Sequence, residues 1–314
     1  MKVFVTGVAG QLGNDCVIEL QKRGHYVIGS DIADDTDAQY VTALGKAPET
    51  RFVYEKLDIT DEKAVKTIIN RVCPDAIIHC AAWTAVDAAE DPANREKVHA
   101  INAEGTRFIA EAAKAVNAKM MYISTDYVFD GQGTAPWDPD CKEYAPLNHY
   151  GKTKLEGELA VSGILDKYFI VRIAWVFGNS PSAKNFIKTM INVGKTHETV
   201  RVVNDQIGTP TYTADLSRLL IDMIETEKYG YYHATNSECK PGEYISWADL
   251  AEEAYRCKGM DVNVIHVTTE EYGVSIAARP YNSRLDKSKL ISSGFNPLPD
   301  WKDAVKRYIS EAKL

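Results

Sequence analysis

The sequence contains no long run of apolar residues, and its first residues lack the apolar core of a secretory signal peptide. We therefore expect neither a membrane span nor secretion, and we expect a cytoplasmic location. Cysteine is sparse as well. The six cysteines are scattered and none belongs to a C-x-x-C pair, which favours reduced thiols over disulfides or a zinc site.

Basic residues are too few to balance the acidic ones, and the formal net charge is −8. This charge argues against a general nucleic-acid-binding protein, which normally presents a basic face. An anionic substrate is still compatible with it, because a binding site needs only a few local cations. A length of 314 residues is enough for one large α/β unit and a smaller lobe.

The first 31 residues have the pattern of a nucleotide-binding unit. An apolar strand over residues 2–6 runs into Gly7-Val-Ala-Gly10-Gln-Leu-Gly13, an amphipathic helix follows, and a second strand over residues 25–30 ends at Asp31. Glycines allow backbone N–H groups to approach a pyrophosphate at a helix N-terminus, and an acid in this place accepts hydrogen bonds from ribose hydroxyls. The glycines alone could form only a tight turn, but the flanking strands and Asp31 favour dinucleotide binding.

Strands and helices continue to alternate along the chain. We expect strands over residues 52–56, 76–79, 119–124 and 168–174, and helices over residues 61–71 and 94–116. This order predicts an α/β fold with a doubly wound parallel sheet, in which ligands bind beyond the carboxyl ends of the strands. The residues predicted to bind the cofactor are Gly7, Gly10, Gln11, Leu12, Gly13, Asp31, Asp58, Ile59, Ala81, Ala82, Tyr150 and Lys154.

Three polar side chains suggest carbonyl chemistry. If residues 150–160 are helical, Tyr150 and Lys154 lie one turn apart on one face. A neighbouring ammonium group favours the phenolate, so Lys154 is expected to lower the Tyr150 pKa from its usual value of about 10. Tyr150 can then donate a proton, Thr125 can polarise the C=O, and a nicotinamide can supply hydride.

Each of these residues also has an ordinary structural explanation. Tyr-x-x-x-Lys can be a solvated helix pair, Thr125 can cap a helix, Asp126 can form a turn, and Ala81-Ala82 can lie in a tight turn. Their joint occurrence after a nucleotide-binding unit favours catalysis.

The glycine spacing G-x-x-G-x-x-G departs from the dehydrogenase fingerprint G-x-G-x-x-G and resembles the extended branch of the short-chain dehydrogenase/reductase superfamily. Segments spread over nearly the whole chain further resemble the dTDP-4-dehydrorhamnose reductases. They are residues 6–13, 81–90, 124–131, 150–154, 172–178, 203–216 and 279–286.

This resemblance implies NAD(P)H-dependent reduction of the C4 keto group of dTDP-4-dehydro-L-rhamnose to dTDP-L-rhamnose, with Thr125, Tyr150 and Lys154 as catalytic residues. Nucleotide-sugar dehydratases of the same branch usually have Asp-Glu after the catalytic Thr, whereas here Asp126-Tyr127 follows, which disfavours dehydration. Arg279 has a surface ion pair as its alternative role. The implied substrate-binding residues are Thr84, Val86, Thr125, Asp126, Trp175, Asn185, Gln206, Arg279 and Asn282.

The cofactor can be NADPH or NADH. Asp31 would repel a 2′-phosphate and the glycine loop has no Lys or Arg, so the residues favour NADH, whereas the resembling family is usually associated with NADPH. Some of its members are described as magnesium-linked dimers. Asp15 could be one ligand, but no others can be placed, so no metal residue is predicted and the protein is expected to be a monomer or homodimer.

Two alternative functions stay open at this point. One is a non-catalytic regulatory subunit like that of methionine adenosyltransferase, which keeps nucleotide binding, although it would not need Thr125, Tyr150 and Lys154. The other is reduction of another 4-keto nucleotide sugar.

We expect residues 1–176 and about 211–232 to form the NAD(P)-binding Rossmann domain, and about 177–210 and 233–314 to form the nucleotide-sugar lobe, with Trp247 and Trp301 filling core contacts.

Overall fold

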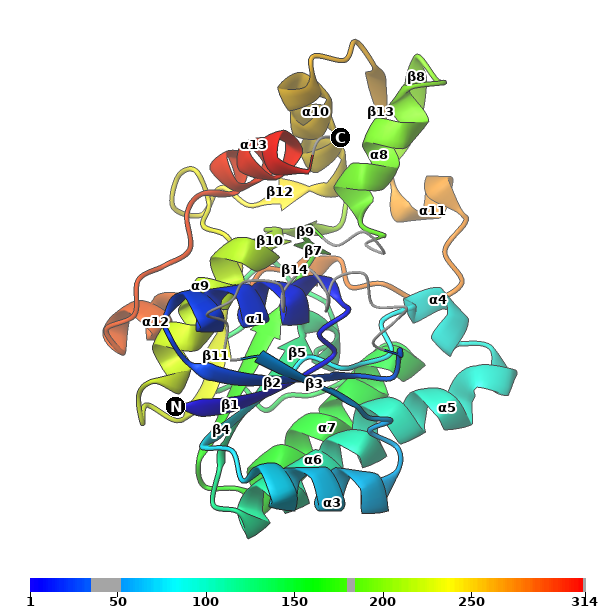
Figure 1. Ribbon diagram of the computed structural model, residues 1–314. Helices are drawn as coiled ribbons and strands as arrows, with labels where there is room; N and C mark the ends of the chain where they lie inside the picture. Colours follow the sequence, from blue (N-terminus) through cyan, green and yellow to red (C-terminus); the bar gives the residue numbers. More distant parts are fainter. Residues whose placement is uncertain (35–51, 180–183, 313–314) are drawn as a thin grey trace.

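A parallel sheet forms the centre of the larger lobe (Figure 1). The computed structural model describes residues 1–34, 52–179 and 184–312. The sheet has seven strands in the order β11-β6-β5-β4-β1-β2-β3, and all neighbouring pairs are parallel. Its strands are β1 (Lys2–Thr6), β2 (Tyr26–Asp31), β3 (Phe52–Lys56), β4 (Ala76–His79), β5 (Lys119–Thr125), β6 (Tyr168–Ile173) and β11 (Gly230–His233).

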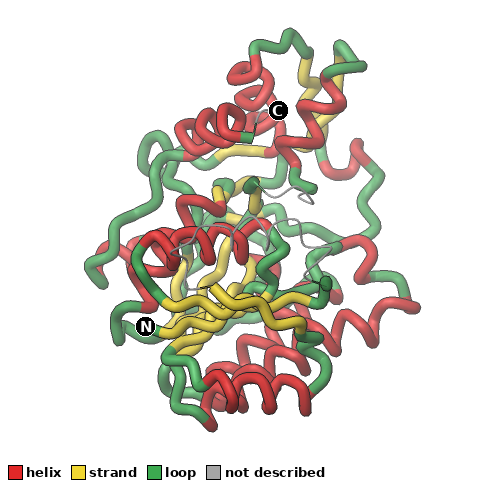
Figure 2. Tube along the Cα trace, viewed as in Figure 1, coloured by secondary structure: helices red, strands yellow, loops and turns green. Residues whose placement is uncertain are grey.

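Helices cover both faces of this sheet (Figure 2). On one face, α1 (Gln11–Lys22) and α9 (Thr213–Ile224) share a core with the strands. On the other face the covering helices are α3 (Glu62–Val72), α6 (Thr106–Ala115) and α7 (His149–Ile164). The inner strands β1, β4, β5 and β6 are buried almost throughout because helices cover both faces of the sheet, as is usual for parallel sheets. The predicted doubly wound α/β fold is confirmed.

The helix predicted over residues 94–116 is not uniform. It consists of a 3₁₀ turn η1 (Pro92–Asn94), α5 (Arg95–His99), a π-helical segment η2 (Ala100–Gly105) and α6. The π-helical segment contains the buried Asn102, whose amide accepts from the Trp83 N–H at 2.8 Å and donates to the Trp83 carbonyl and the Thr153 hydroxyl. The irregular turn therefore connects the loop after β4 to α7, which is a long-range requirement that helical periodicity does not reveal.

The smaller lobe has its own core, built mainly from α8 (Phe186–Gly194), α10 (Trp247–Lys258) and α13 (Trp301–Glu311). The chain crosses between the lobes more than once, since α9 and β11 return to the large sheet. The domain limits given above stay a prediction. The remaining elements are α4 (Val86–Ala89), η3 (Asp126–Val128), β7 (Val176–Phe177), β8 (Thr199–Val203), β9 (Ile207–Gly208), β10 (Thr211–Tyr212), β12 (Ile245–Ser246), β13 (Asn263–Val267), α11 (Thr269–Tyr272), β14 (Asn282–Ser283) and α12 (Ser288–Ser292).

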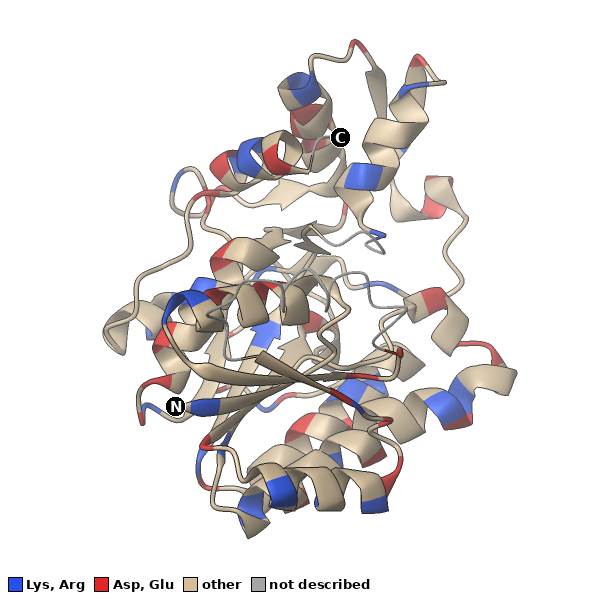
Figure 3. Ribbon diagram, viewed as in Figure 1, with Lys and Arg blue, Asp and Glu red and all other residues tan. Residues whose placement is uncertain are grey.

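The distribution of charged residues and the state of the cysteines agree with the sequence analysis. Lys and Arg are interspersed with Asp and Glu on the helices of both lobes (Figure 3). All six cysteines have free thiols, as expected. Within the described ranges, none of the helices is both long enough and apolar enough to span a bilayer.

Candidate active site

A cavity of about 760 Å³ lies at the carboxyl ends of the central strands and extends to the smaller lobe. Of the predicted site residues, all but Gln206 and Asn282 line it. Those lining it are Gly7, Gly10, Gln11, Leu12, Gly13, Asp31, Asp58, Ile59, Ala81, Ala82, Thr84, Val86, Thr125, Asp126, Tyr150, Lys154, Trp175, Asn185 and Arg279.

The glycine loop forms one end of the cavity and leaves no room for a Cβ at Gly7 or Gly13. Gly7 has φ +72°, and a Cβ on it would lie 2.7 Å from the Ala81 nitrogen. A Cβ on Gly13 would collide with the Gly7 carbonyl group, whose carbon would be 2.7 Å away. No side-chain cap occupies the start of α1, which leaves its first amides without a capping side chain, as a pyrophosphate site requires. This loop fits a dinucleotide.

Replacing Gly13 with Ala is expected to weaken NADH binding by about tenfold or more, because the colliding partner is backbone and the loop must move. Gly163→Ala is the matched control. It lies in α7 with nothing within 4 Å of the added Cβ, so it should stabilise the protein by up to about 1 kcal/mol. Fluorescence titration with NADH and thermal unfolding measure both effects, and unchanged NADH affinity in Gly13→Ala would contradict the assignment of this loop.

Asp31 lies at the end of β2, beside the glycine loop. Its carboxylate accepts hydrogen bonds from the backbone N–H groups of Ala9 at 2.9 Å and Ile32 at 2.8 Å. These bonds fix the side chain at the cavity edge. A carboxylate in this position can accept from ribose hydroxyls.

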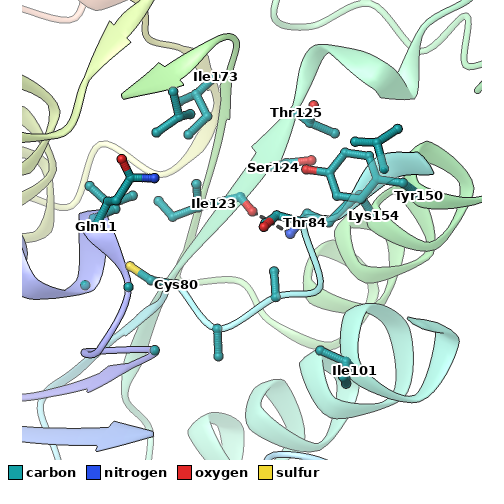
Figure 4. Close-up of a pocket in the computed structure, with 18 of the residues that line it drawn as sticks. Gln11, Cys80, Thr84, Ile101, Ile123, Ser124, Thr125, Tyr150, Lys154 and Ile173 are labelled. Carbon is teal, nitrogen blue, oxygen red and sulfur yellow. Dashed lines mark hydrogen bonds between the residues drawn. The ribbon is translucent and has the colours of Figure 1, made fainter. Parts of the chain in front are cut away.

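The side chains of Tyr150, Lys154, Ser124 and Thr125 gather on the side of the cavity opposite Gln11 (Figure 4). Asn148 begins α7 by accepting from the Gly151 N–H at 2.8 Å, which places Tyr150 in the first turn. Lys154 follows one turn later and is buried, with 3% of its surface exposed. Its ammonium group donates to the Ile123 carbonyl at 2.7 Å and lies over the Tyr122 ring.

The expected effect of Lys154 on Tyr150 is not seen. Burial raises the pKa of Tyr150 above its usual range, although a hydrogen bond with Thr125 opposes this. Burial also lowers the pKa of Lys154 to about 7. The expectation fails because the ammonium group is directed to the Ile123 carbonyl, and desolvation of the phenolate dominates. Tyr150 therefore keeps its proton at neutral pH, which is the state that a proton donor needs.

Thr125 is held by its neighbour. Its hydroxyl donates to Asp126 at 3.0 Å, and the other Asp126 oxygen accepts from Ser283 at 2.5 Å. Burial raises the Asp126 pKa to about 6, although these hydrogen bonds oppose the shift. Ser283 lies in β14, so Asp126 connects the catalytic strand end to a segment of the smaller lobe.

The smaller lobe contributes an aromatic wall. Trp175 has φ +51°, a strained conformation for a bulky residue, and its ring stacks on Trp247 with centroids 4.0 Å apart. Both indoles line the cavity. Trp247 also packs against the core of the smaller lobe, as expected, so its place at the cavity is an additional finding. Trp301 is buried in the core, as expected. Strain of this kind is a recurrent property of functional sites.

Asn185 lies at the meeting point of the two lobes. Its side-chain oxygen caps α8 by accepting from the Lys188 N–H at 3.0 Å. Its amide nitrogen donates to Gln11 of the glycine loop at 3.1 Å and to Tyr308 at 2.9 Å. Asn185 therefore connects the glycine loop with the smaller lobe.

Two predicted substrate-binding residues are engaged elsewhere. Gln206 is buried and bonds Trp247 and Thr269. Asn282 is buried in β14 and donates to the carbonyls of Gln132 and Ala135. Neither side chain lines the cavity, and a part for either residue in substrate binding stays a prediction. Gln206 supports the wall through Trp247.

Sequence reasoning missed other cavity residues, of which Tyr127 and Lys184 are the most polar. Tyr127 follows Asp126, and its ring meets the Tyr150 ring edge-on, with centroids 5.7 Å apart. Its position next to the Ser124-Thr125-Asp126 segment was the available signal. Lys184 precedes Asn185 and had no comparable signal.

Asp15, the one magnesium ligand considered, lies within α1 away from the cavity lining. Burial raises its pKa to about 7. Among the residues that the structure describes, no group of three or more His, Cys, Asp or Glu side chains is arranged to hold a metal ion.

Comparison with known proteins agrees with this geometry. The family model of the RmlD substrate binding domain matches residues 1–314. The chain belongs to this family. The dTDP-4-dehydrorhamnose reductase of Streptomyces griseus is 38% identical over 309 residues, which are 96% of this chain and 91% of that protein.

Two solved structures of the RmlD family extend the likeness to the fold. A dTDP-4-dehydrorhamnose reductase from Clostridium acetobutylicum has a TM-score of 0.86 and 39% identity, with complete coverage of both chains. The Bacillus anthracis dTDP-4-dehydrorhamnose reductase, solved in complex with NADP, has a TM-score of 0.84 and 37% identity, with 99% of each chain covered. The chain therefore shares its family and its fold with proteins named dTDP-4-dehydrorhamnose reductase.

Proposed function

We propose that this protein reduces the C4 keto group of dTDP-4-dehydro-L-rhamnose to give dTDP-L-rhamnose. One observation carries the proposal. The hydroxyls of Thr125 and Tyr150 and the buried Lys154 share one wall of a cavity whose other end is a glycine loop suited to a dinucleotide. Reduction of a ketone needs a proton donor and a polarising hydrogen bond opposite a hydride source.

Each residue has a distinct part in the mechanism. When bound, the nicotinamide cofactor supplies the hydride. Tyr150 donates its proton to the carbonyl oxygen. The Thr125 hydroxyl, whose single proton is directed to Asp126 in the structure, turns from Asp126 to donate it to the same oxygen when substrate binds. Lys154, one turn after Tyr150, lines the same wall and would hold the ribose of the nicotinamide cofactor. Asp31 accepts from the adenosine ribose.

The arrangement also supports reduction over water loss. Dehydration requires a base next to the reacting sugar. Tyr127 occupies the place after Asp126, and burial raises its pKa above the ordinary range of a tyrosine hydroxyl, so it stays protonated.

Incubation with dTDP-4-dehydro-L-rhamnose should consume NADH or NADPH and form dTDP-L-rhamnose, identified by NMR. No consumption with either cofactor would reject the proposal. Parallel assays with UDP- and GDP-linked 4-keto sugars test which nucleobase of the substrate the enzyme accepts.

Asp31 should make NADH the better cofactor. A hydrogen bond to a charged group contributes about 1.5–3 kcal/mol, so Asp31→Ala is expected to shift the NADPH-to-NADH ratio of kcat/KM toward NADPH by about 10–100-fold. Asp34→Ala is the control, because Asp34 is exposed and pairs with Lys56 outside the cavity lining. Steady-state kinetics with both cofactors measure the ratio. A wild-type preference for NADPH that Asp31→Ala leaves unchanged would contradict this role.

A further inference from the structure

A segment of the smaller lobe, residues 276–282, crosses to the larger lobe beside the cavity, and we call it the strap. In Figure 1 the chain runs from α11 down toward α4 at this point. Backbone groups of the strap form hydrogen bonds with the larger lobe. Asp87 accepts from the Ala277 N–H at 3.0 Å, Asn148 donates to the Ala278 carbonyl at 2.8 Å, and the Asn282 N–H donates to Gly131 at 2.8 Å.

The strap carries Arg279, which lines the cavity and is paired with Asp87 of α4. The two side chains meet fork to fork, with Nη1 3.0 Å from Oδ1 and Nη2 2.8 Å from Oδ2. The paired guanidinium and the Ala277 N–H hold the pKa of Asp87 below its usual value. Such bidentate pairs fix the plane of the guanidinium as well as its position. The ion pair weighed as an alternative for Arg279 therefore exists, but at the cavity wall.

Arg279 lines the same cavity as the catalytic tyrosine. The charges of Arg279 and Asp87 act on the pKa of the Tyr127 hydroxyl in opposite directions. The Tyr127 ring in turn packs edge-on against Tyr150. Arg279, Tyr127 and the proton donor Tyr150 therefore line one cavity, in which the substrate must lie.

The guanidinium retains donors for a ligand. A guanidinium has five N–H groups. Within the described residues, the hydrogen bonds of Arg279 use Nη1 toward Asp87 and Ala277 and Nη2 once toward Asp87. Nε–H and the second Nη2 hydrogen are then available on the same planar group. Phosphate oxygens match this donor geometry, and Lys184 is a further basic residue of the cavity lining.

We propose that Asp87 is a positioning residue that holds Arg279 at the cavity wall, where its remaining donors receive the diphosphate of the nucleotide sugar. This inference rests on the proposed function, since it concerns the same substrate. Asp87 of α4, in the larger lobe, would thus position the guanidinium of Arg279, which belongs to the smaller lobe. The alternative is that the diphosphate must displace Arg279 from Asp87 in order to bind, and we call this arrangement a latch.

Binding to dTDP and to thymidine separates the two arrangements. If Asp87 positions Arg279, Asp87→Ala and Asp87→Asn should weaken dTDP binding by about tenfold or more. The same variants should leave thymidine binding unchanged, because thymidine has no phosphate. KM for the nucleotide sugar should rise similarly while kcat stays within about twofold. A latch predicts tighter dTDP binding in the same variants, which would overturn the proposal.

Three further variants test whether the effect is specific. Asp87→Glu should recover part of the dTDP affinity because it keeps the carboxylate. Asp87→Ala combined with Arg279→Met should bind dTDP no more weakly than Arg279→Met alone. Asp91→Ala is the matched control, since Asp91 caps the adjacent η1 turn by accepting from the Ala93 N–H at 2.9 Å. It should leave dTDP affinity unchanged.

Failure of this inference is distinguishable from failure of the proposed function. Normal wild-type turnover with unchanged KM in Asp87→Ala would reject positioning alone. Absent wild-type turnover with dTDP binding that still depends on Asp87 would reject the activity alone. Equal losses of dTDP and thymidine binding in Asp87→Ala and Asp87→Asn would show a general structural role and would overturn the inference.

Discussion

Replacing Tyr150 with Phe is expected to lower turnover by about 10²–10⁴-fold, the usual contribution of a positioned general acid. The change removes only the hydroxyl, and the ring keeps its edge-on contact with Tyr127. NADH binding should stay within a few fold of the wild type because the glycine loop and Asp31 are untouched. Steady-state turnover and fluorescence titration with NADH measure the two quantities on one preparation.

Tyr127 makes this experiment informative in a second way. Its phenol lines the same cavity and stays protonated, so it is the competing proton donor. More than about a tenth of wild-type turnover in Tyr150→Phe would contradict the mechanism and direct attention to Tyr127→Phe. Tyr232→Phe is the control, because Tyr232 of β11 bonds the Lys228 carbonyl outside the cavity lining.

Breaking the pair between Arg172 and Glu158 is expected to cost about 3–5 kcal/mol of unfolding free energy. Both side chains are fully buried, with 0% exposure, and two guanidinium nitrogens donate to the carboxylate at 2.9 and 2.8 Å. Arg172→Met leaves the Glu158 carboxylate buried without its cation, which is the costly state. Urea unfolding followed by circular dichroism measures the loss.

An exposed pair supplies the control. Arg71 and Glu55 are 2.8 Å apart, and 60% of the Arg71 side chain is exposed, so Arg71→Met should cost less than about 1 kcal/mol. Combining Arg172→Met with Glu158→Leu should recover part of the stability by removing the unpaired charge. A loss below about 1 kcal/mol in Arg172→Met would show that the buried carboxylate finds another partner.

The central sheet and much of the site could be predicted because their signals are local. A glycine loop between two apolar strands, and a Tyr and a Lys one helical turn apart, are readable within a few residues. The partners of Gln206 could not be read in this way. Its bond to Trp247 spans 41 residues, and no short pattern indicates that one side chain supports the other.

The direction of the Tyr150 pKa shift was missed for a related reason. Sequence spacing gives the neighbour of a group, but the pKa depends on its desolvation, which the whole fold determines. Asn282 illustrates the same limit. It belongs to the same strap as Arg279, which lines the cavity, yet the Asn282 amide donates to Gln132 and Ala135 and lies outside the lining.

The core of the smaller lobe has a consequence for engineering. Its apolar residues come from stretches of chain on both sides of α9 and β11, from Phe177 to Ile309. Such a lobe cannot be cut out or exchanged between relatives as one contiguous cassette. Changing which sugars are accepted should therefore proceed by single substitutions at wall positions such as Trp175 and Trp247, with the backbone connections kept whole.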